Sequence, residues 1–229
     1  MKLASNGKID ENMPYFSSNF FDLGGQTLYV SRTGFTNELG FEIFCDGFKT
    51  DHLALWDYLI ECGKPYGMQF SASRAMTIRR IEGGIFGNLT DIDTTITPFE
   101  AGLGYFVNMD KDFIGKDALI KKDKRTCLFG ITCKTAVPKA GSKIKINDKQ
   151  VGYITAGVPS PTLQQGIGYV RFYEPNDYIN KEIEIILPDH SSHTGVVVDL
   201  PFFDKEKKIV KGIDRSIPIK PDSNSFDAK

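Results

Sequence analysis

Apolar and polar residues alternate between residues 26 and 46, which predicts two β-strands joined by the glycine-bounded loop 34–40. Successive side chains of a strand point to opposite faces of the sheet. In the second strand Glu42 and Phe44 therefore share one face, and Ile43 lies on the other. The alternation places a carboxylate beside an aromatic ring on one surface.

Two helices are predicted from apolar residues at helical spacing. The first begins after Thr50 or Asp51, either of which can cap it, and ends at Gly63. The second runs from about Ser73 to Glu82 and ends before two glycines. The apolar stripe of the first helix should pack on the sheet.

The second half of the chain has a different pattern, with about six short strand-like runs between Cys127 and Phe203. Short strands separated by turns favour a small antiparallel barrel or sandwich. The charged segment 110–124 predicts a short helix at the junction, and the polar residues after 203 predict an extended arm or a frayed tail. The expected divisions are an N-terminal domain (1–108), a junction helix (109–125), a barrel domain (126–203) and a polar tail (204–229).

The charge balance of the chain argues against some classes of binding partner. The 229 residues carry a net charge of -1, so there is no general attraction to nucleic acid or to an anionic membrane. No apolar run is long enough to span a bilayer, and the first residues turn polar before a signal peptide could form, so we expect a cytoplasmic protein. The four cysteines have no CxxC spacing, so we expect them to be reduced and buried. They are Cys45, Cys62, Cys127 and Cys133.

Glu42 is the first candidate for a binding residue. A carboxylate accepts two parallel hydrogen bonds, which suits the edge of a planar ring that carries an amino group and an adjacent N–H. Phe44 beside it offers an apolar wall, so the pair suits a flat heterocycle such as a pterin. A strand glutamate in water, or one paired with a nearby arginine, is the alternative that this segment alone leaves open.

Three other residues invite a functional interpretation. His190 and His193 have neither a cysteine nor a carboxylate at a matching distance, so we predict a polar hairpin turn and no metal site. Glu100 could belong to a site, but Thr97–Pro98–Phe99–Glu100 also fits a tight turn, and we favour that structural role.

Four stretches, in the same order along the chain, resemble the T protein of the glycine cleavage system and its folate-dependent relatives. They are RTGFTNELGFEIF (32–44), RIEGG (80–84), TPFEAGL with DFIGKDAL (97–103 and 112–119) and GYITAGVPSPTL (152–163). The resemblance implies an α+β fold in which part of a folate-binding, T-protein-like domain precedes a C-terminal antiparallel β-barrel. It also implies that tetrahydrofolate binds the first of these domains.

The resemblance assigns roles to four residues. Glu42 stands where the family binds the pterin, and Arg80 where an arginine lies close to the cofactor. The Arg80 guanidinium could hold a carboxylate of the glutamyl tail, or it could be a helix-end cation paired with Glu82 or a backbone carbonyl. Phe35 replaces a family aromatic that is usually tyrosine, and Phe44 stands where the demethylase branch carries tyrosine. The expected cofactor-binding residues are therefore Glu42, Arg80, Phe35 and Phe44.

The implied activity is tetrahydrofolate-dependent one-carbon transfer of the aminomethyltransferase type. In that reaction an aminomethyl group comes from a lipoyl carrier protein, ammonia leaves, and the folate receives the carbon. A demethylase of the dimethylsulfoniopropionate type, with a small-molecule donor, is one alternative. The folate domain of dimethylglycine or sarcosine dehydrogenases is another, and a non-catalytic folate-binding fragment is a third.

The family's reactive aspartate belongs to an N-terminal half that this chain does not match, so we expect no catalytic residue here. We expect a fragment, a truncated gene product or one component of a split enzyme. Half of a folate domain would leave strand edges and apolar surface uncovered. That favours either a separate N-terminal half or a homodimer.

Overall fold

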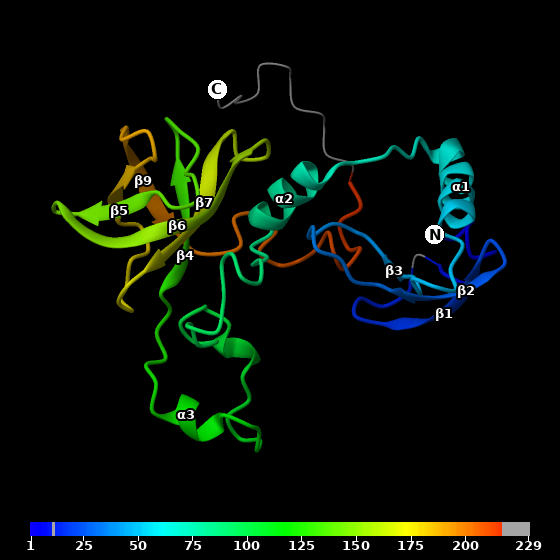
Figure 1. Ribbon diagram of the computed structural model, residues 1–229, viewed down its shortest axis with the longest axis horizontal. Coiled ribbons are helices and arrows are strands. Elements are labelled where there is room, and N and C mark those ends of the chain that lie inside the picture. The colour runs from blue at the N-terminus through cyan, green and yellow to red at the C-terminus, as the bar shows by residue number, and fades with distance from the viewer. Residues whose placement is uncertain (11, 217–229) are drawn as a thin grey trace. The chain divides into compact units, whose positions relative to one another are not determined.

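The computed structural model describes residues 1–10 and 12–216. It divides into two compact units, of which the first comprises Met1–Arg79 with residues 206–216 and the second Arg80–Lys205. Each unit has its own cluster of buried apolar side chains. Figure 1 labels most of the helices and strands.

The first unit contains a three-stranded antiparallel sheet in the order β1-β2-β3. Its strands are β1 (Ser18–Leu23), β2 (Gln26–Ser31) and β3 (Glu42–Phe44). Gly24 and Gly25 connect β1 to β2 with φ of 65° and 83°, a backbone conformation that favours glycine. The predicted alternation is confirmed, since Val30 and Ile43 lie opposite each other towards the core while Glu42 and Phe44 are exposed.

Strand β1 was missing from the two-strand prediction. Its sequence SNFFDL places Phe20 and Phe21 side by side, which hides the period of two. In the structure Phe20 is exposed and Phe21 packs against the core of this unit. The alternation is present, but two adjacent phenylalanines mask it.

Helix α1 (His52–Gly63) begins where the sequence predicted. The Asp51 carboxylate accepts a hydrogen bond from the Ala54 amide at 3.0 Å and so caps the first turn. Leu55 is buried and belongs to the same apolar cluster as Leu28 and Val30 of β2. The 3-10 helix η1 (Lys64–Tyr66) follows directly.

Helix α2 (Ser73–Glu82) also matches its prediction, and the boundary between the two units falls inside it. Gly84, with φ of 70°, follows the helix. A Cβ at Gly84 would lie 2.9 Å from Pro201, so this position also requires a residue without a side chain.

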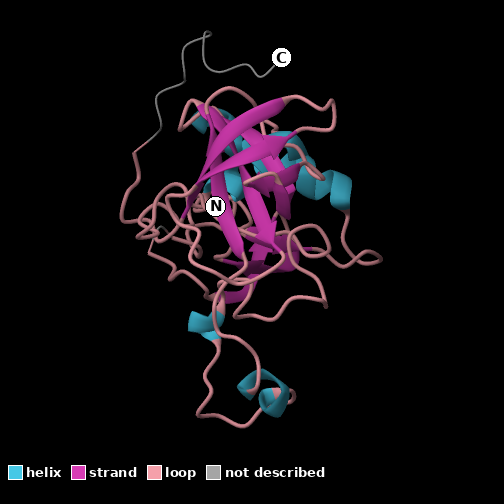
Figure 2. Ribbon diagram, turned by 90° about the vertical axis from the view of Figure 1, so that its left-hand side faces the viewer, coloured by secondary structure: helices cyan, strands magenta, loops and turns pink. Residues whose placement is uncertain are grey.

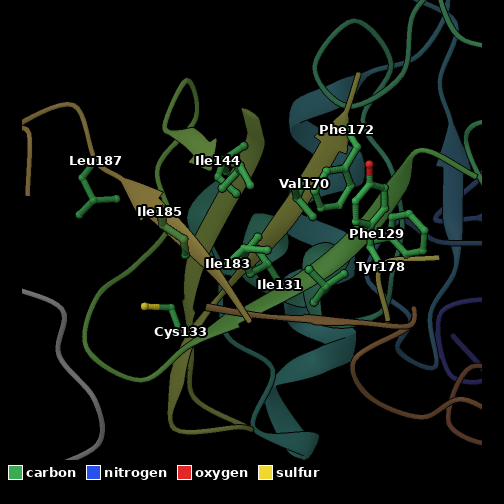
Figure 3. Close-up of a cluster of buried hydrophobic side chains, with 12 residues drawn as sticks. Phe129, Ile131, Cys133, Ile144, Val170, Phe172, Tyr178, Ile183, Ile185 and Leu187 are labelled. Atoms are coloured by element: carbon green, nitrogen blue, oxygen red, sulfur yellow. The ribbon is translucent and has the colours of Figure 1, made fainter. Parts of the chain in front are cut away.

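The second unit is built on a closed antiparallel barrel in the order β4-β7-β6-β5-β8-β9. Its strands are β4 (Leu128–Cys133), β5 (Lys143–Ile146), β6 (Lys149–Ser160), β7 (Gln165–Phe172), β8 (Glu182–Ile186) and β9 (Ser192–Val198). Apolar side chains from these strands fill the interior, and Phe172 of β7 stacks on Tyr178, from the segment before β8, at a centroid distance of 3.6 Å (Figure 3). Of the two architectures that the sequence favoured, the barrel is the one formed.

The connection from α2 to the barrel is mostly loop, with the short helices η2 (Gly104–Phe106) and α3 (Lys116–Ile120) (Figure 2). Only five residues of the charged segment 110–124 are helical, and Gly115, with φ of 93°, precedes the first of them. In the turn before η2, the Thr97 amide donates to the Glu100 carboxylate at 2.8 Å. The Glu100 amide donates back to the Thr97 hydroxyl, which is the structural role predicted for Glu100.

Of the two alternatives for the polar segment after residue 203, a frayed tail does not fit residues 206–216, because Val210 is buried and its carbonyl accepts a hydrogen bond from Arg32. Residues 217–229 lie outside the described residues. Cys45 is exposed rather than buried, because it follows the end of β3, whereas Cys127 and Cys133 are buried as expected. Among residues 1–10 and 12–216, no helix combines the length and apolar character needed to cross a membrane.

Candidate functional site

Glu42 lies at the start of β3, on the open face of the sheet in the first unit. It stands directly opposite Ser31 of β2. The Thr33 hydroxyl donates to a Glu42 carboxylate oxygen and lies 2.9 Å from the Ser31 hydroxyl. A carboxylate has about four acceptor positions, so the bond from Thr33 orients Glu42 and leaves it able to accept from a ligand.

A row of three exposed rings crosses the same face beside Glu42. Phe20, Tyr29 and Phe44 are cross-strand neighbours on β1, β2 and β3. Their ring centroids are 5.1 Å apart for Phe20 and Tyr29 and 5.8 Å apart for Tyr29 and Phe44. The Tyr29 hydroxyl lies 2.5 Å from the Ser18 hydroxyl, which fixes the middle ring. The structure thus brings Glu42 and Phe44 together, as predicted, and adds two rings that were not assigned to the site.

The alternation of side chains along β2 could have placed Tyr29 on the face of the site. Tyr29 and Ser31 lie on one face of the strand, and Leu28 and Val30 lie on the other, towards the core. The alternation gives the face, but only the cross-strand register places Tyr29 beside Phe44. Phe20 could not be assigned because its strand was missed.

Phe35 lies in the loop that precedes β3 rather than on the sheet, and its side chain is exposed. The loop is held by the buried Arg32, whose guanidinium donates to the carbonyls of Gly40 and Val210, each at 2.9 Å. Burial lowers the pKa of Arg32, while the nearby Tyr15 opposes that shift. The guanidinium also lies 5.2 Å from the Phe41 ring centroid, so both ends of the loop are anchored by one side chain.

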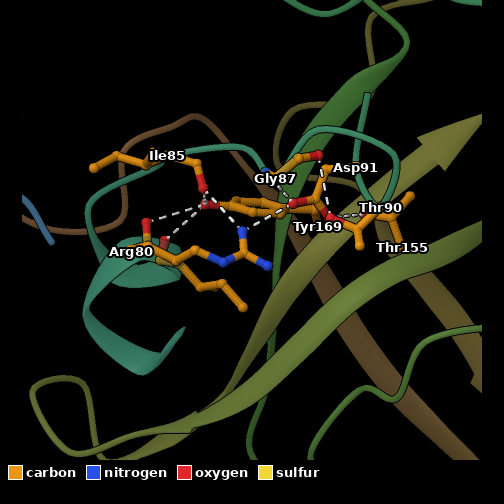
Figure 4. Close-up of polar contacts among 8 residues, drawn as sticks. Arg80, Ile85, Gly87, Thr90, Asp91, Thr155 and Tyr169 are labelled. Atoms are coloured by element: carbon orange, nitrogen blue, oxygen red, sulfur yellow. Dashed lines mark hydrogen bonds and ion pairs between the residues drawn. The ribbon is translucent and has the colours of Figure 1, made fainter. Parts of the chain in front are cut away.

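Arg80 belongs to the second unit and is buried in a polar network (Figure 4). Its guanidinium donates to Asp91 at 2.9 Å and to the Ile85 carbonyl at 3.0 Å. Asp91 also accepts from the Gly87 amide at 2.7 Å and from the Thr155 hydroxyl of β6 at 2.6 Å. A backbone carbonyl is therefore one partner of Arg80, as one sequence interpretation held, and Asp91 is a partner that the sequence did not reveal.

Tyr169 of β7 completes this network. Its hydroxyl lies 3.1 Å from the Ile85 carbonyl oxygen and within hydrogen-bond reach of the carbonyls of Arg80 and Ile81. Burial raises the pKa of Tyr169, and the charge of Asp91 raises it further. The phenol therefore remains protonated as a donor to the end of α2.

In the HSSH segment, the ring of His193 has hydroxyl neighbours. Nδ1 of His193 lies 3.0 Å from the Thr135 hydroxyl, and its Nε2 lies 3.1 Å from the Ser191 hydroxyl. Within the part of the chain that the structure describes, no three ligating side chains gather as a metal site would require.

The open face of the sheet is suited to binding rather than to proton transfer. An oriented carboxylate can accept from the N–H edge of a heterocycle, and the rings beside it can cover the apolar faces of that heterocycle. These are the few convergent polar groups and aromatic walls that small-molecule sites combine.

Two family models match the chain. The description of the first is the GCVT N-terminal domain, over residues 2–111. The second is the glycine cleavage T-protein C-terminal barrel domain, over residues 124–204. Together they include the sheet of the first unit and the barrel of the second, and they leave residues 112–123 unmatched.

Similar proteins agree with these matches. An aminomethyltransferase from Alkaliphilus oremlandii is 40% identical over 162 residues, which are 68% of this chain and 43% of that protein. Another, from Caldanaerobacter subterraneus, is 36% identical over 194 residues, which are 81% and 50% of the two chains. The crystal structure of glycine cleavage system aminomethyltransferase T from Bartonella henselae has a TM-score of 0.72 at 22% identity and shares the fold over 88% of this chain and 56% of that one. The chain spans about half the length of the curated relatives it matches.

Proposed function

Because this chain belongs to the glycine cleavage T-protein family, we propose that it serves tetrahydrofolate-dependent one-carbon transfer of the aminomethyltransferase type. The observation that carries the proposal is the Glu42 carboxylate, oriented by Thr33 beside the exposed Phe44 ring. A pterin has a ring edge that donates hydrogen bonds and two apolar faces, so these residues fit it.

Each residue has a role in binding. Glu42 accepts from the N–H edge of the pterin, Phe44 lies against its ring, and Phe35 closes the site from the loop before β3. Tetrahydrofolate, when bound, supplies the nitrogen that receives the one-carbon unit. The contribution of this chain is to hold that nitrogen in a fixed position and orientation relative to the donor.

For Arg80 we propose a position close to the folate, with the direction of its guanidinium set by Asp91. The buried ion pair supports the fixed direction of the guanidinium, because a guanidinium held at 2.9 Å from a buried carboxylate has little rotational freedom.

The donor and the partners follow from the same premise. We propose an aminomethyl group on a lipoyl carrier protein as the donor, and a separate N-terminal half or a second copy of this chain as the partner that completes the site. The names of the relatives favour the aminomethyl donor over a sulfonium compound. We place the protein in the cytoplasm, in keeping with its composition.

Titration calorimetry with tetrahydrofolate tests the binding role. Glu42→Gln removes the charge and half of the acceptor capacity, so we expect the binding free energy to weaken by about 1–3 kcal/mol. The matched control is Glu184→Gln, because Glu184 is a strand carboxylate that accepts from the Ser192 hydroxyl at 2.7 Å in the barrel. Unchanged affinity for Glu42→Gln would remove Glu42 from the site.

An assay of the complemented protein tests the catalytic role. The chain is mixed with the N-terminal half of a T-protein relative, an aminomethyl-loaded lipoyl carrier and tetrahydrofolate, and ammonia release is measured. We expect release only when both halves are present. Folate binding without turnover in the complemented mixture would show a non-catalytic folate-binding module instead.

A further inference from the structure

A small cavity lies in the second unit, between strands β6 and β7 of the barrel and the segment that leads to Glu100. Its volume is about 250 Å³, below the roughly 300–1,000 Å³ of drug-sized ligand sites, so it suits a small metabolite. One positive and one negative side chain line it, those of Arg171 and Glu100. Opposite charges that converge on one cavity are a chemical signature of the ligand that could fill it.

Arg171 supplies the positive charge from β7, where it stands opposite Tyr153 of β6. Its side chain is only 16% exposed. The guanidinium donates to the Thr95 hydroxyl at 2.7 Å and lies 3.5 Å from the Asp93 carboxylate, which is long for a charge-assisted hydrogen bond. A guanidinium has five N–H donors, so these two contacts within the described chain leave it able to hold a further carboxylate.

Glu100 supplies the negative charge and is fixed in place. Its carboxylate accepts from the Thr97 amide at 2.8 Å, and its carbonyl accepts from the Cys127 amide at 2.7 Å. Burial raises the pKa of Glu100, but the bonds from Thr97 and nearby positive charges outweigh burial, so the pKa lies below its ordinary value. Lys122 and Arg171 supply those charges. The ionised carboxylate has about four acceptor positions and can also take an ammonium group.

The other walls of the cavity carry no charge. Ile96 and the rings of Tyr153 and Phe172 supply apolar surface. The Cys127 thiol also lines the cavity, and burial, followed by the charge of Glu100, raises its pKa to about 11, so it is neutral at physiological pH. One cation, one anion and apolar walls match an α-amino acid, whose carboxylate and ammonium groups are bonded to the same carbon.

We propose that this cavity binds a free α-amino acid with an apolar side chain, with the ligand carboxylate on Arg171 and the ligand ammonium group on Glu100. An anion alone would meet the repulsive charge of Glu100, and a cation alone would meet that of Arg171, so the two charges together select a zwitterion. The site belongs to the second unit, whereas Glu42 and Phe44, proposed for the pterin, belong to the first. Binding here does not depend on the proposed folate chemistry.

Amide chemical-shift titrations of the isotope-labelled full chain test the site with three probes. L-Leucine carries both charges, isocaproate lacks the ammonium group and isoamylamine lacks the carboxylate, while all three share the same branched carbon chain. L-Leucine should shift the amides of Ile96 and Tyr153 with a Kd of about 1 mM or below. Each single-charge probe should bind about tenfold more weakly, because it leaves one charged group of the cavity without its partner.

Variants of the two charged residues assign the contacts. Arg171→Met should reduce the affinity for L-leucine to that for isoamylamine, and Glu100→Gln should reduce it to that for isocaproate. Glu100→Gln retains an acceptor for the Thr97 amide, so the turn is kept. Arg171→Lys keeps the charge without the planar fork and should weaken L-leucine by a smaller factor. Arg125→Met is the matched control, because it changes an exposed arginine of the same unit that is paired with Asp123.

Three results would overturn the amino-acid site. The first is that L-leucine leaves the amides around the cavity unmoved. The second is that isocaproate binds as tightly as L-leucine, which would make Arg171 part of a simple anion site. The third is that neither Arg171→Met nor Glu100→Gln weakens L-leucine, which would place the ligand elsewhere. The amide spectra also show whether each variant is folded, and where Arg171→Met is not, Arg171→Lys gives the result.

Discussion

Glu42 and Ser31 lie directly opposite each other in the ladder between β3 and β2, and the Thr33 hydroxyl contacts both side chains. The register therefore decides where the carboxylate points. A shift of one residue would turn Glu42 towards the core and Ile43 towards the open face. Ile43 belongs to the buried cluster of the first unit, so hydrophobic burial resists that shift and keeps Glu42 exposed to a ligand.

Arg32 should stabilise the loop that leads into β3. Arg32→Met removes the donors to the carbonyls of Gly40 and Val210, and the buried Val210 acceptor left unsatisfied costs about 1–3 kcal/mol. We expect the urea midpoint of unfolding to fall without a change in the m-value. Arg125→Met, which alters an exposed arginine paired with Asp123, should leave the midpoint where it was. Equal midpoints for Arg32→Met and the parent would contradict the anchoring role.

Asp91 and Arg80 should behave as a coupled pair in stability measurements. Asp91→Ala removes an acceptor shared by Arg80, Gly87 and Thr155, and breaking a buried ion pair costs about 3–5 kcal/mol. The double variant Arg80→Met with Asp91→Ala should lose less than Asp91→Ala alone, because the guanidinium is no longer buried beside a missing carboxylate. Chemical denaturation of the four proteins in this cycle measures the coupling.

A double variant whose loss equals the sum of the two single losses would show that the pair is not coupled. Asp57→Ala serves as the control for the loss of an exposed carboxylate on α1, and it should leave the stability unchanged.

Stability should fall at alkaline pH partly through Cys127. Burial, and then the charge of Glu100, raises the pKa of this thiol from 9.0 to about 11. The folded state keeps the proton where the unfolded state releases it, so the contribution is fully present below pH 9 and is lost as the pH rises to about 11. We expect the unfolding free energy of the parent to decline more steeply over this window than that of Cys127→Ala.

Cys45→Ala is the matched control, because it removes an exposed thiol and should reproduce the slope of the parent. Identical slopes for the parent and Cys127→Ala would show that the thiol does not contribute to the alkaline loss of stability. Urea unfolding at several pH values gives these slopes directly.

Local features of this fold could be predicted from the sequence. The faces of Glu42, Phe44 and Ile43 follow from a period of two, and Asp51 follows from the preference for acidic caps at a helix start. Both signals lie within a few residues of the element that they define. The bounds of the predicted domains stay predictions, although the barrel itself is formed.

Long-range relationships could not be predicted in the same way. Asp91 is 11 residues from Arg80, and Thr155 is 64 residues beyond Asp91, so no periodicity connects them. The neighbours Tyr29 and Phe44 meet only through the register of two strands joined by a loop. The position of Val210 within the first unit likewise depends on a hydrogen bond from a residue 178 positions away, Arg32. Such pairs become visible only when the chain is folded.

A crystal structure of this chain with bound tetrahydrofolate tests the central claim most directly. The account predicts that both carboxylate oxygens of Glu42 lie within hydrogen-bond distance of the N–H edge of the pterin, with the Phe44 ring against one face of the heterocycle. A ligand bound elsewhere, or a Glu42 carboxylate turned away from the pterin, would contradict it.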